Sequence, residues 1–146
     1  MEKFGGQAGE VGVFHGTPKE ETVRWICSLG FDQRMNGTHG TKFGKGAYFA
    51  TAANYSHQFT HPTGIAGLRS MFYAGVLVGQ KVEGKSEYRR PPPIDPRDPK
   101  RGLYDTCVDN VANPSIFVVF DNNQSYPGYV IEYREIVAAV GGKIGT

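Results

Sequence analysis

The sequence has little cysteine and no long apolar run, and these two absences narrow the class of protein. Its two cysteines, Cys27 and Cys107, lie far apart and form no CxxC pair, so a disulfide scaffold is not indicated. Free thiols are typical of a reducing compartment, which predicts an intracellular protein, cytoplasmic or nuclear. No apolar run approaches the roughly 20 residues of a membrane-spanning helix, and the opening "MEKFGGQAGEVG" lacks the apolar centre of a signal peptide.

An excess of charge of one sign is also lacking. The formal net charge is only +2, and the lysines and arginines are scattered along the chain, so composition does not indicate a nucleic-acid-binding protein. The 146 residues match the usual size of one domain and can bury a core without a metal or a disulfide. We therefore expect a single domain over residues 1–146.

Glycine, by contrast, is abundant, with 20 residues in the chain. The stretch "GFDQRMNGTHGTKFGKG", Gly30–Gly46, contains five of them and has neither a helical nor a strand period, which predicts an ordered loop. Loops of this length inside compact domains are usually functional or disordered.

The first regular elements are predicted around "VFHGTPKEE". The apolar run Val11–Phe14 indicates a strand, and a helix start follows it. Thr17 suits the N-cap, Pro18 the first helical position, and Glu20 completes a capping box. We expect the helix over Pro18–Ser28, ended by a left-handed glycine. Its buried face is predicted to hold Val23, Ile26 and Cys27.

The rest of the chain is predicted to contain more strand than helix. The "RRPPPIDPRDPKRG" stretch is predicted to be a surface connection, because its prolines remove hydrogen-bond donors. A brief helix is expected over residues 51–59. The last two strands are expected to form a hairpin or a short looped pair through "NNQSYP". Without regular strand–helix alternation, the prediction is an α+β domain with a mostly antiparallel sheet. The predicted strands are Ala47–Ala50, Ser70–Gly79, Ser115–Asp121 and Gly128–Glu135.

Several polar residues are candidates for chemistry, and each has a structural alternative. His15 ends an apolar run and either closes a turn or binds a ligand beside the N–H groups of Gly16 and Thr17 at the expected helix start. "GKGAYFA" lacks the spacing of a phosphate-binding P-loop. His57 and His61 have helical spacing but no third ligand, so no metal site is predicted. Cys107 is expected to be a buried structural thiol.

Six fragments, taken in order and spacing, resemble one family. They are "FHGT", "GKGAYFA", "NYSHQF", "RRPPP", "LYDTCVDN" and "NPSIFVVFDNNQSYPGYVIEY". Together they resemble the poly(ADP-ribose) polymerase catalytic domain from about Val13 to Tyr133, and most closely its mono-ADP-ribosyltransferase branch with CCCH zinc fingers. The resemblance implies the ADP-ribosyltransferase fold and NAD as the ADP-ribose donor.

The resemblance also implies roles for residues near the first two motifs. His15 corresponds to the histidine that binds the nicotinamide-side ribose, and the backbone of Gly16 to the partner of the carboxamide. Thr17 follows where a small hydroxyl residue is usual. Tyr48 corresponds to the second member of the catalytic triad and to a wall of the nicotinamide pocket.

Further positions complete the implied donor site. Ser56 corresponds to the serine whose hydroxyl binds the carboxamide, and Phe59 to the aromatic that stacks on nicotinamide, where tyrosine is more usual; Tyr55 is the second candidate. The Gly30–Gly44 loop corresponds to the loop that covers the donor. Its residues implied to approach adenosine or pyrophosphate are Arg34, His39 and Lys42.

Two departures from the family pattern are visible. The third triad position, glutamate in polymer-forming members, is Ile116, and the nearest other carboxylate by motif is Glu132. The chain also begins a few residues before "HGT", whereas the family has a preceding helix and strand, so we expect a minimal member or a shortened chain.

The function implied is NAD-dependent transfer of one ADP-ribose unit to protein side chains, automodification included. Cleavage of the nicotinamide bond develops positive charge on the ribose, as in glycoside hydrolysis, so the protein mainly has to hold both sides of the bond. The alternatives are an inactive NAD-, ADP-ribose- or partner-binding module of the same fold, and a transferase that modifies nucleic-acid ends.

Overall fold

The computed structural model describes residues 9–32 and 42–136. None of the helices in these two ranges is long and apolar enough to span a membrane. The regular elements, in chain order, are β1 (Glu10–Thr17), α1 (Glu20–Leu29), β2 (Ala47–Ala50), α2 (Ala53–His57), β3 (Arg69–Leu77), β4 (Lys81–Glu83), η2 (Pro99–Arg101), β5 (Thr106–Val108), β6 (Ile116–Val119), η3 (Asn122–Gln124) and β7 (Ser125–Tyr133).

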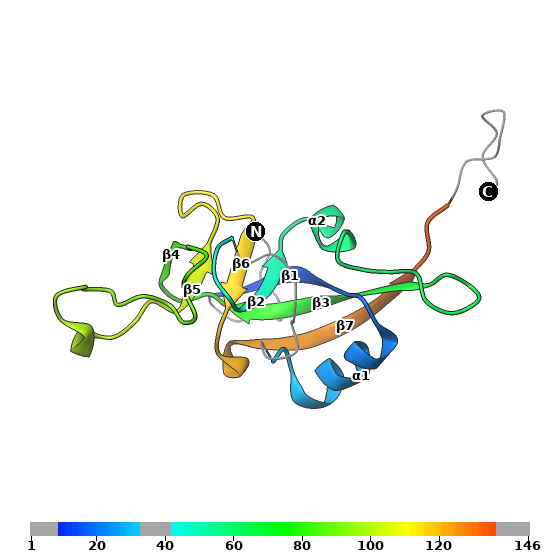
Figure 1. Cartoon of the computed structure of the whole chain (residues 1–146), viewed down its shortest axis with the longest axis horizontal. Helices are drawn as coiled ribbons and strands as arrows, with labels where there is room; N and C mark the ends of the chain where they lie inside the picture. The colour runs from blue at the N-terminus through cyan, green and yellow to red at the C-terminus, as the bar shows by residue number, and fades with distance from the viewer. Residues whose placement is uncertain (1–8, 33–41, 137–146) are drawn as a thin grey trace.

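Within the described ranges, seven strands form one sheet in the order β4-β5-β6-β2-β1-β3-β7. The β4–β5 pair is parallel and the other pairs are antiparallel. Figure 1 shows α1 and α2 on opposite sides of the part of the sheet formed by β1, β3 and β7. The predicted α+β class with a mostly antiparallel sheet is confirmed.

The core lies on the face of the sheet that α1 covers, and strand alternation selects its residues. Val11 and Val13 of β1 are buried and belong to the same apolar cluster as Phe72 of β3 and Ile26 of α1. Only one residue of α1, Ile26, is fully buried, so the helix packs through a narrow stripe. Cys27 is exposed, and its predicted place on the buried face was wrong.

The predicted helix start was also wrong. Strand β1 continues through Thr17, whose hydroxyl donates to the Ser70 carbonyl at 3.2 Å, and α1 begins at Glu20 with Lys19 as an N-cap that makes no side-chain hydrogen bond. Pairing with β3 out to Thr17–Ser70 outweighs the local capping preference. The left-handed end was right: Gly30 has φ 80° and its N–H bonds to Ile26 O.

The expected pairing of the last two strands was wrong as well. In the sheet, β6 and β7 are separated by β2, β1 and β3, and the short η3 carries the chain from one part of the sheet to the other. The Gln124 side chain stabilises this crossing by donating to Leu77 O and Thr106 Oγ1, each at 3.1 Å. Two short strands, β4 and β5, were not predicted.

Candidate active site

His15 lies near the end of β1, and its imidazole is fixed by β2. Nδ1 is 2.7 Å from Tyr48 O; because a carbonyl only accepts, Nδ1 carries the hydrogen, and Nε2 is an acceptor in the neutral ring. The rings of Phe31 and Phe49 pack around it with centroids 5.0 and 5.2 Å away. His15 is 8% exposed, so the ring is held in one orientation.

Tyr48 ties the glycine-rich loop to β2. Its hydroxyl donates to Gly44 O at 2.7 Å and accepts from Phe43 N at 3.0 Å. Burial raises the pKa of Tyr48, although the hydrogen bond from Phe43 opposes this shift. The phenol is therefore neutral near pH 7, and its half-buried ring is a fixed wall.

Ser56 and Gly16 join α2 to β1. The buried Ser56 hydroxyl donates to Phe14 O at 3.0 Å, which leaves its oxygen lone pairs as acceptors. A Cβ at Gly16 would collide with the backbone oxygen of Ser56. Glycine is required here because α2 approaches the strand backbone directly.

The two aromatic candidates of α2 lie against each other. The ring centroids of Tyr55 and Phe59 are 5.3 Å apart in an edge-to-face arrangement, and both side chains are half-buried. Burial raises the pKa of Tyr55, and the charge of Asp109 raises it further. Phe59 stays the predicted stacking residue.

A polar network anchors the end of α2 to β7. His57 Nδ1 lies 2.6 Å from the Tyr133 hydroxyl, and Nε2 lies 2.9 Å from Glu135 Oε1. Arg69 adds an ion pair to Glu135 at 3.0 Å and donates to Thr60 O at 2.8 Å. His57 is thus used in tertiary contacts, and in residues 9–32 and 42–136 no cluster of His, Cys, Asp or Glu is arranged to hold a metal ion.

Ile116, at the third triad position, opens β6 and pairs with Ala50 of β2. Its neighbour Asp109, which sequence reasoning did not single out, holds the turn before it. The Asp109 carboxylate accepts from Ser115 N and Ile116 N at 2.9 and 3.0 Å and from Ser115 Oγ at 2.5 Å. The available signal was an aspartate shortly before "NPS", since such residues commonly accept from turn backbone.

The remaining predicted residues are placed as follows. Arg34 and His39 lie outside the described residues. Lys42 is exposed, with its ammonium 5.4 Å from the centroid of the Phe43 ring. Cys107 is fully buried, and burial raises its thiol pKa to about 11, as expected of a structural cysteine. The predicted N–H groups of Gly16 and Thr17 belong to β1 and not to a helix start, which corrects that interpretation.

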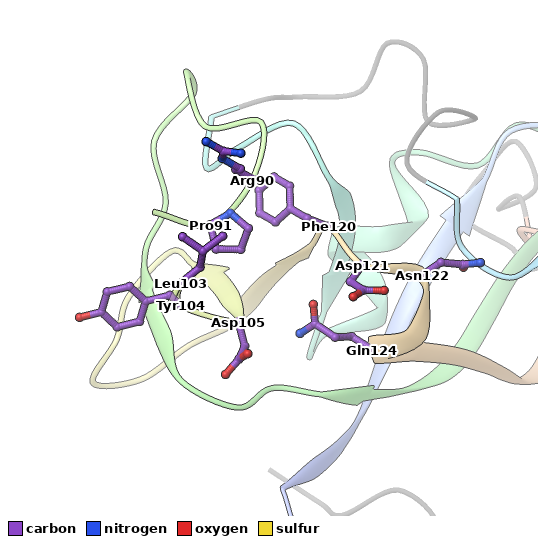
Figure 2. Close-up of a pocket in the computed structure, with 9 residues that line it drawn as sticks. All are labelled: Arg90, Pro91, Leu103, Tyr104, Asp105, Phe120, Asp121, Asn122 and Gln124. Atoms are coloured by element: carbon purple, nitrogen blue, oxygen red, sulfur yellow. The ribbon is translucent and has the colours of Figure 1, made fainter. Parts of the chain in front are cut away.

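A hollow of about 410 Å³ lies elsewhere, beside the link from β6 to η3 (Figure 2). In Figure 2, Asp105 and Arg90 lie toward opposite sides of it. Phe120 follows the last residue of β6, so the hollow and Ile116 lie at opposite ends of that strand. None of the predicted site residues lines it. The lining residues are Arg90, Pro91, Leu103, Tyr104, Asp105, Phe120, Asp121, Asn122 and Gln124.

The contacts described above tie His15 to the backbone of Tyr48 in β2 and tie Ser56 of α2 to the backbone of Phe14 in β1. Residues 2–135 match the family model of the poly(ADP-ribose) polymerase catalytic domain. The chain belongs to this family.

Its relatives are named as mono-ADP-ribosyltransferases. Protein mono-ADP-ribosyltransferase PARP11 of Mus musculus is 44% identical, over 88% of this chain and 43% of its own length. Protein mono-ADP-ribosyltransferase PARP12 of Homo sapiens is 45% identical over 88% of this chain and 18% of its own length. Protein mono-ADP-ribosyltransferase PARP14 of Homo sapiens is 38% identical over 91% of this chain and 7% of its own length. The chain thus spans less than half the length of these relatives.

Proposed function

We propose that this chain transfers a single ADP-ribose unit from NAD to protein side chains and releases nicotinamide. The observation that carries the proposal is that backbone contacts join the segments that carry His15, Gly16, Tyr48 and Ser56 where β1 meets β2 and α2. The names of the relatives support the same reaction.

In this proposal, the donor is held from two sides. His15 Nε2 accepts from a hydroxyl of the nicotinamide-side ribose, since Nδ1 already donates to Tyr48 O. The Ser56 oxygen accepts from the carboxamide N–H, because its own hydrogen is directed to Phe14 O. The flat walls are Tyr48 and Phe59, and a planar ring between aromatic side chains with few polar partners is a usual binding mode.

Ile116 limits what the site does to the acceptor. A neutral hydroxyl acceptor needs a base, which isoleucine does not supply, whereas an aspartate or glutamate acceptor is already ionised near neutral pH. We therefore propose protein carboxylates as acceptors, including those of the chain itself. Both cysteines are free, which supports a reducing intracellular compartment.

The test is an assay with NAD labelled in its adenylate part, in which nicotinamide release and label transfer to protein are both followed. His15→Ala is expected to lower transfer at least tenfold, on the order of the effect of losing a positioning contact. His61→Ala is the matched control, because His61 is exposed, and should keep full transfer. Undiminished transfer by a folded His15→Ala protein, or no transfer by the unmutated chain, contradicts the proposal.

A further inference from the structure

Asp109 holds a turn that adjoins the proposed site without belonging to the predicted donor contacts. It follows β5, and its two carboxylate oxygens together accept three hydrogen bonds from the Ser115–Ile116 step. Partial burial raises the pKa of this carboxyl, but the hydrogen bonds from Ser115 and Ile116 outweigh burial and keep the pKa below its ordinary value. The ionised carboxylate is therefore matched to its donors at neutral pH.

The turn itself is closed by further backbone contacts. Asn110 Oδ1 accepts from Ala112 N and Asn113 N at 2.9 and 3.1 Å, and Asp109 N donates to Ile116 O at 3.4 Å. Two consecutive side chains thus order the segment 109–116. Its end, where β6 begins, has little freedom to shift.

This turn is connected directly to the strand that carries Tyr48. Ser115 O accepts from Thr51 N at 3.0 Å, and Ile116 is opposite Ala50 in the β2–β6 pair. The Asp109 charge also acts on Tyr55 of α2. A change in the carboxylate therefore acts on the start of β6 and on the adjoining end of β2, next to the third triad position.

Two roles for Asp109 can be separated by chemistry. As a charge it would stand in for the carboxylate that Ile116 lacks, and as a clamp it would fix geometry. Both of its oxygens already accept hydrogen bonds at 2.5 to 3.0 Å, which favours the clamp. Asparagine keeps one acceptor oxygen in place but removes the charge, so this substitution distinguishes the two roles.

We infer that Asp109 is a positioning residue that fixes the acceptor side of the site by holding Ser115 and Ile116 against β2. The inference rests on the proposed transfer function. Loss of the clamp leaves the donor contacts of His15 and Ser56 intact but misplaces the wall beside which the acceptor attacks. We therefore expect a lower kcat for transfer and an unchanged KM for NAD.

The experiment measures kcat of transfer and KM for NAD in the whole chain, with thermal unfolding as a check of folding. Asp109→Ala is expected to lower kcat about tenfold or more with KM within about twofold. Asp109→Asn is expected to retain kcat within about threefold, because its amide oxygen still accepts from the two backbone N–H groups. Asp121 accepts from Asn123 N at 2.9 Å beyond the other end of β6, so Asp121→Ala is the matched control and should transfer normally.

Each outcome decides the matter. If folded Asp109→Asn and Asp109→Ala proteins lose kcat equally, the charge matters and the clamp is overturned. A normal kcat in Asp109→Ala also overturns the clamp, as does a KM for NAD that rises as much as kcat falls. If Asp109→Ala does not fold, Ser115→Ala removes only the hydroxyl bond, and its kcat should fall about threefold with unchanged KM; an unchanged kcat overturns the clamp. An unmutated chain without transfer overturns the proposed function and this inference together, whereas an active chain with a normal Asp109→Ala variant overturns only the latter.

Discussion

At the scale of single residues, the contact between Ser56 and β1 joins structure and proposed chemistry. The hydroxyl hydrogen is directed to Phe14 O, and the missing side chain of Gly16 lets the Ser56 backbone approach the strand. Ser56 therefore holds α2 in place and, in the proposed function, also supplies the oxygen that accepts from the carboxamide. Its replacement is expected to affect amide ligands before it affects the fold.

Ser56→Ala is predicted to weaken the binding of nicotinamide and benzamide about fivefold or more. The lost hydrogen bond contributes on the order of 1 kcal/mol, and more if the ligand amide is left unpaired. Competition of each amide with NAD in the transfer assay measures the effect. Ser86, which is exposed, gives the control Ser86→Ala. Equal amide affinity in Ser56→Ala and unmutated protein would show that Ser56 is outside the pocket.

At the scale of elements, the turn between β5 and β6 should respond to acid. The pKa of Asp109 is lowered in the folded protein, where hydrogen bonds from Ser115 and Ile116 outweigh the opposing effect of burial. A group with a lowered folded pKa stabilises the protein above its unfolded pKa and loses this contribution as pH falls through the folded value. The contribution is thus complete at neutral pH and lost in acid.

The prediction compares unmutated protein with Asp109→Asn in thermal unfolding from pH 7 to pH 2. The difference in Tm should be constant above about pH 5 and should shrink below about pH 4. Of the two side chains compared at position 109, only that of aspartate takes up a proton in this range. Asp121→Asn is the control for a general charge effect. A Tm difference between unmutated protein and Asp109→Asn that stays constant down to pH 2 would contradict the assignment.

The elements also show what a sequence can predict. Residues Ala47–Ala50 form β2 with the predicted bounds, because a Gly-Lys-Gly turn precedes a compact apolar run. The prediction of Thr17 as the N-cap was wrong because pairing with β3 extends β1. This tertiary effect overrides the local preference. The three-residue strands β4 and β5 have too little pattern of their own to be found. The prediction that β6 pairs with β7 was wrong because a short connection was taken to imply pairing.

Only the residues of the candidate site that lie in short sequence motifs could be predicted from the sequence. The fragments "FHGT", "GKGAYFA" and "NYSHQF" pointed to His15, Tyr48 and Ser56 by their order and spacing. Their mutual contacts depend on how β1, β2 and α2 meet, which no local pattern encodes. The inferred role of Asp109 depends on the path of a turn seven residues long, which no local sequence pattern encodes.

At the scale of the whole molecule, the product should be one ADP-ribose unit per modified residue. Glu132, the other carboxylate considered, lies on β7 opposite Ser70, and three strands separate β7 from the β6 strand that begins at Ile116. No carboxylate from β7 therefore takes over the third triad position. A ribose hydroxyl on an attached unit would lack a base and would not attack a second NAD.

Mass analysis after long incubation with excess NAD checks this prediction. Discrete additions of one unit per residue are expected for the unmutated protein, and also for Ile116→Glu, because chain growth needs loops that hold the elongating acceptor. Asp98→Glu, a conservative change at an exposed ion pair with Arg101, is the control. Ribose-to-ribose chains made by the unmutated protein would overturn the prediction.

The position of β7 in the sheet has a consequence for how the chain acquires its structure. Strand β3 pairs with β7 from Arg69 to Val76, yet β7 is synthesised after every other described strand. During synthesis, the outer edge of β3 stays open until β7 emerges, and open edges invite pairing with other chains. Because the pairing is distant in sequence, we expect slow folding, in which the yield of active protein depends on temperature and on chaperones that shield this edge.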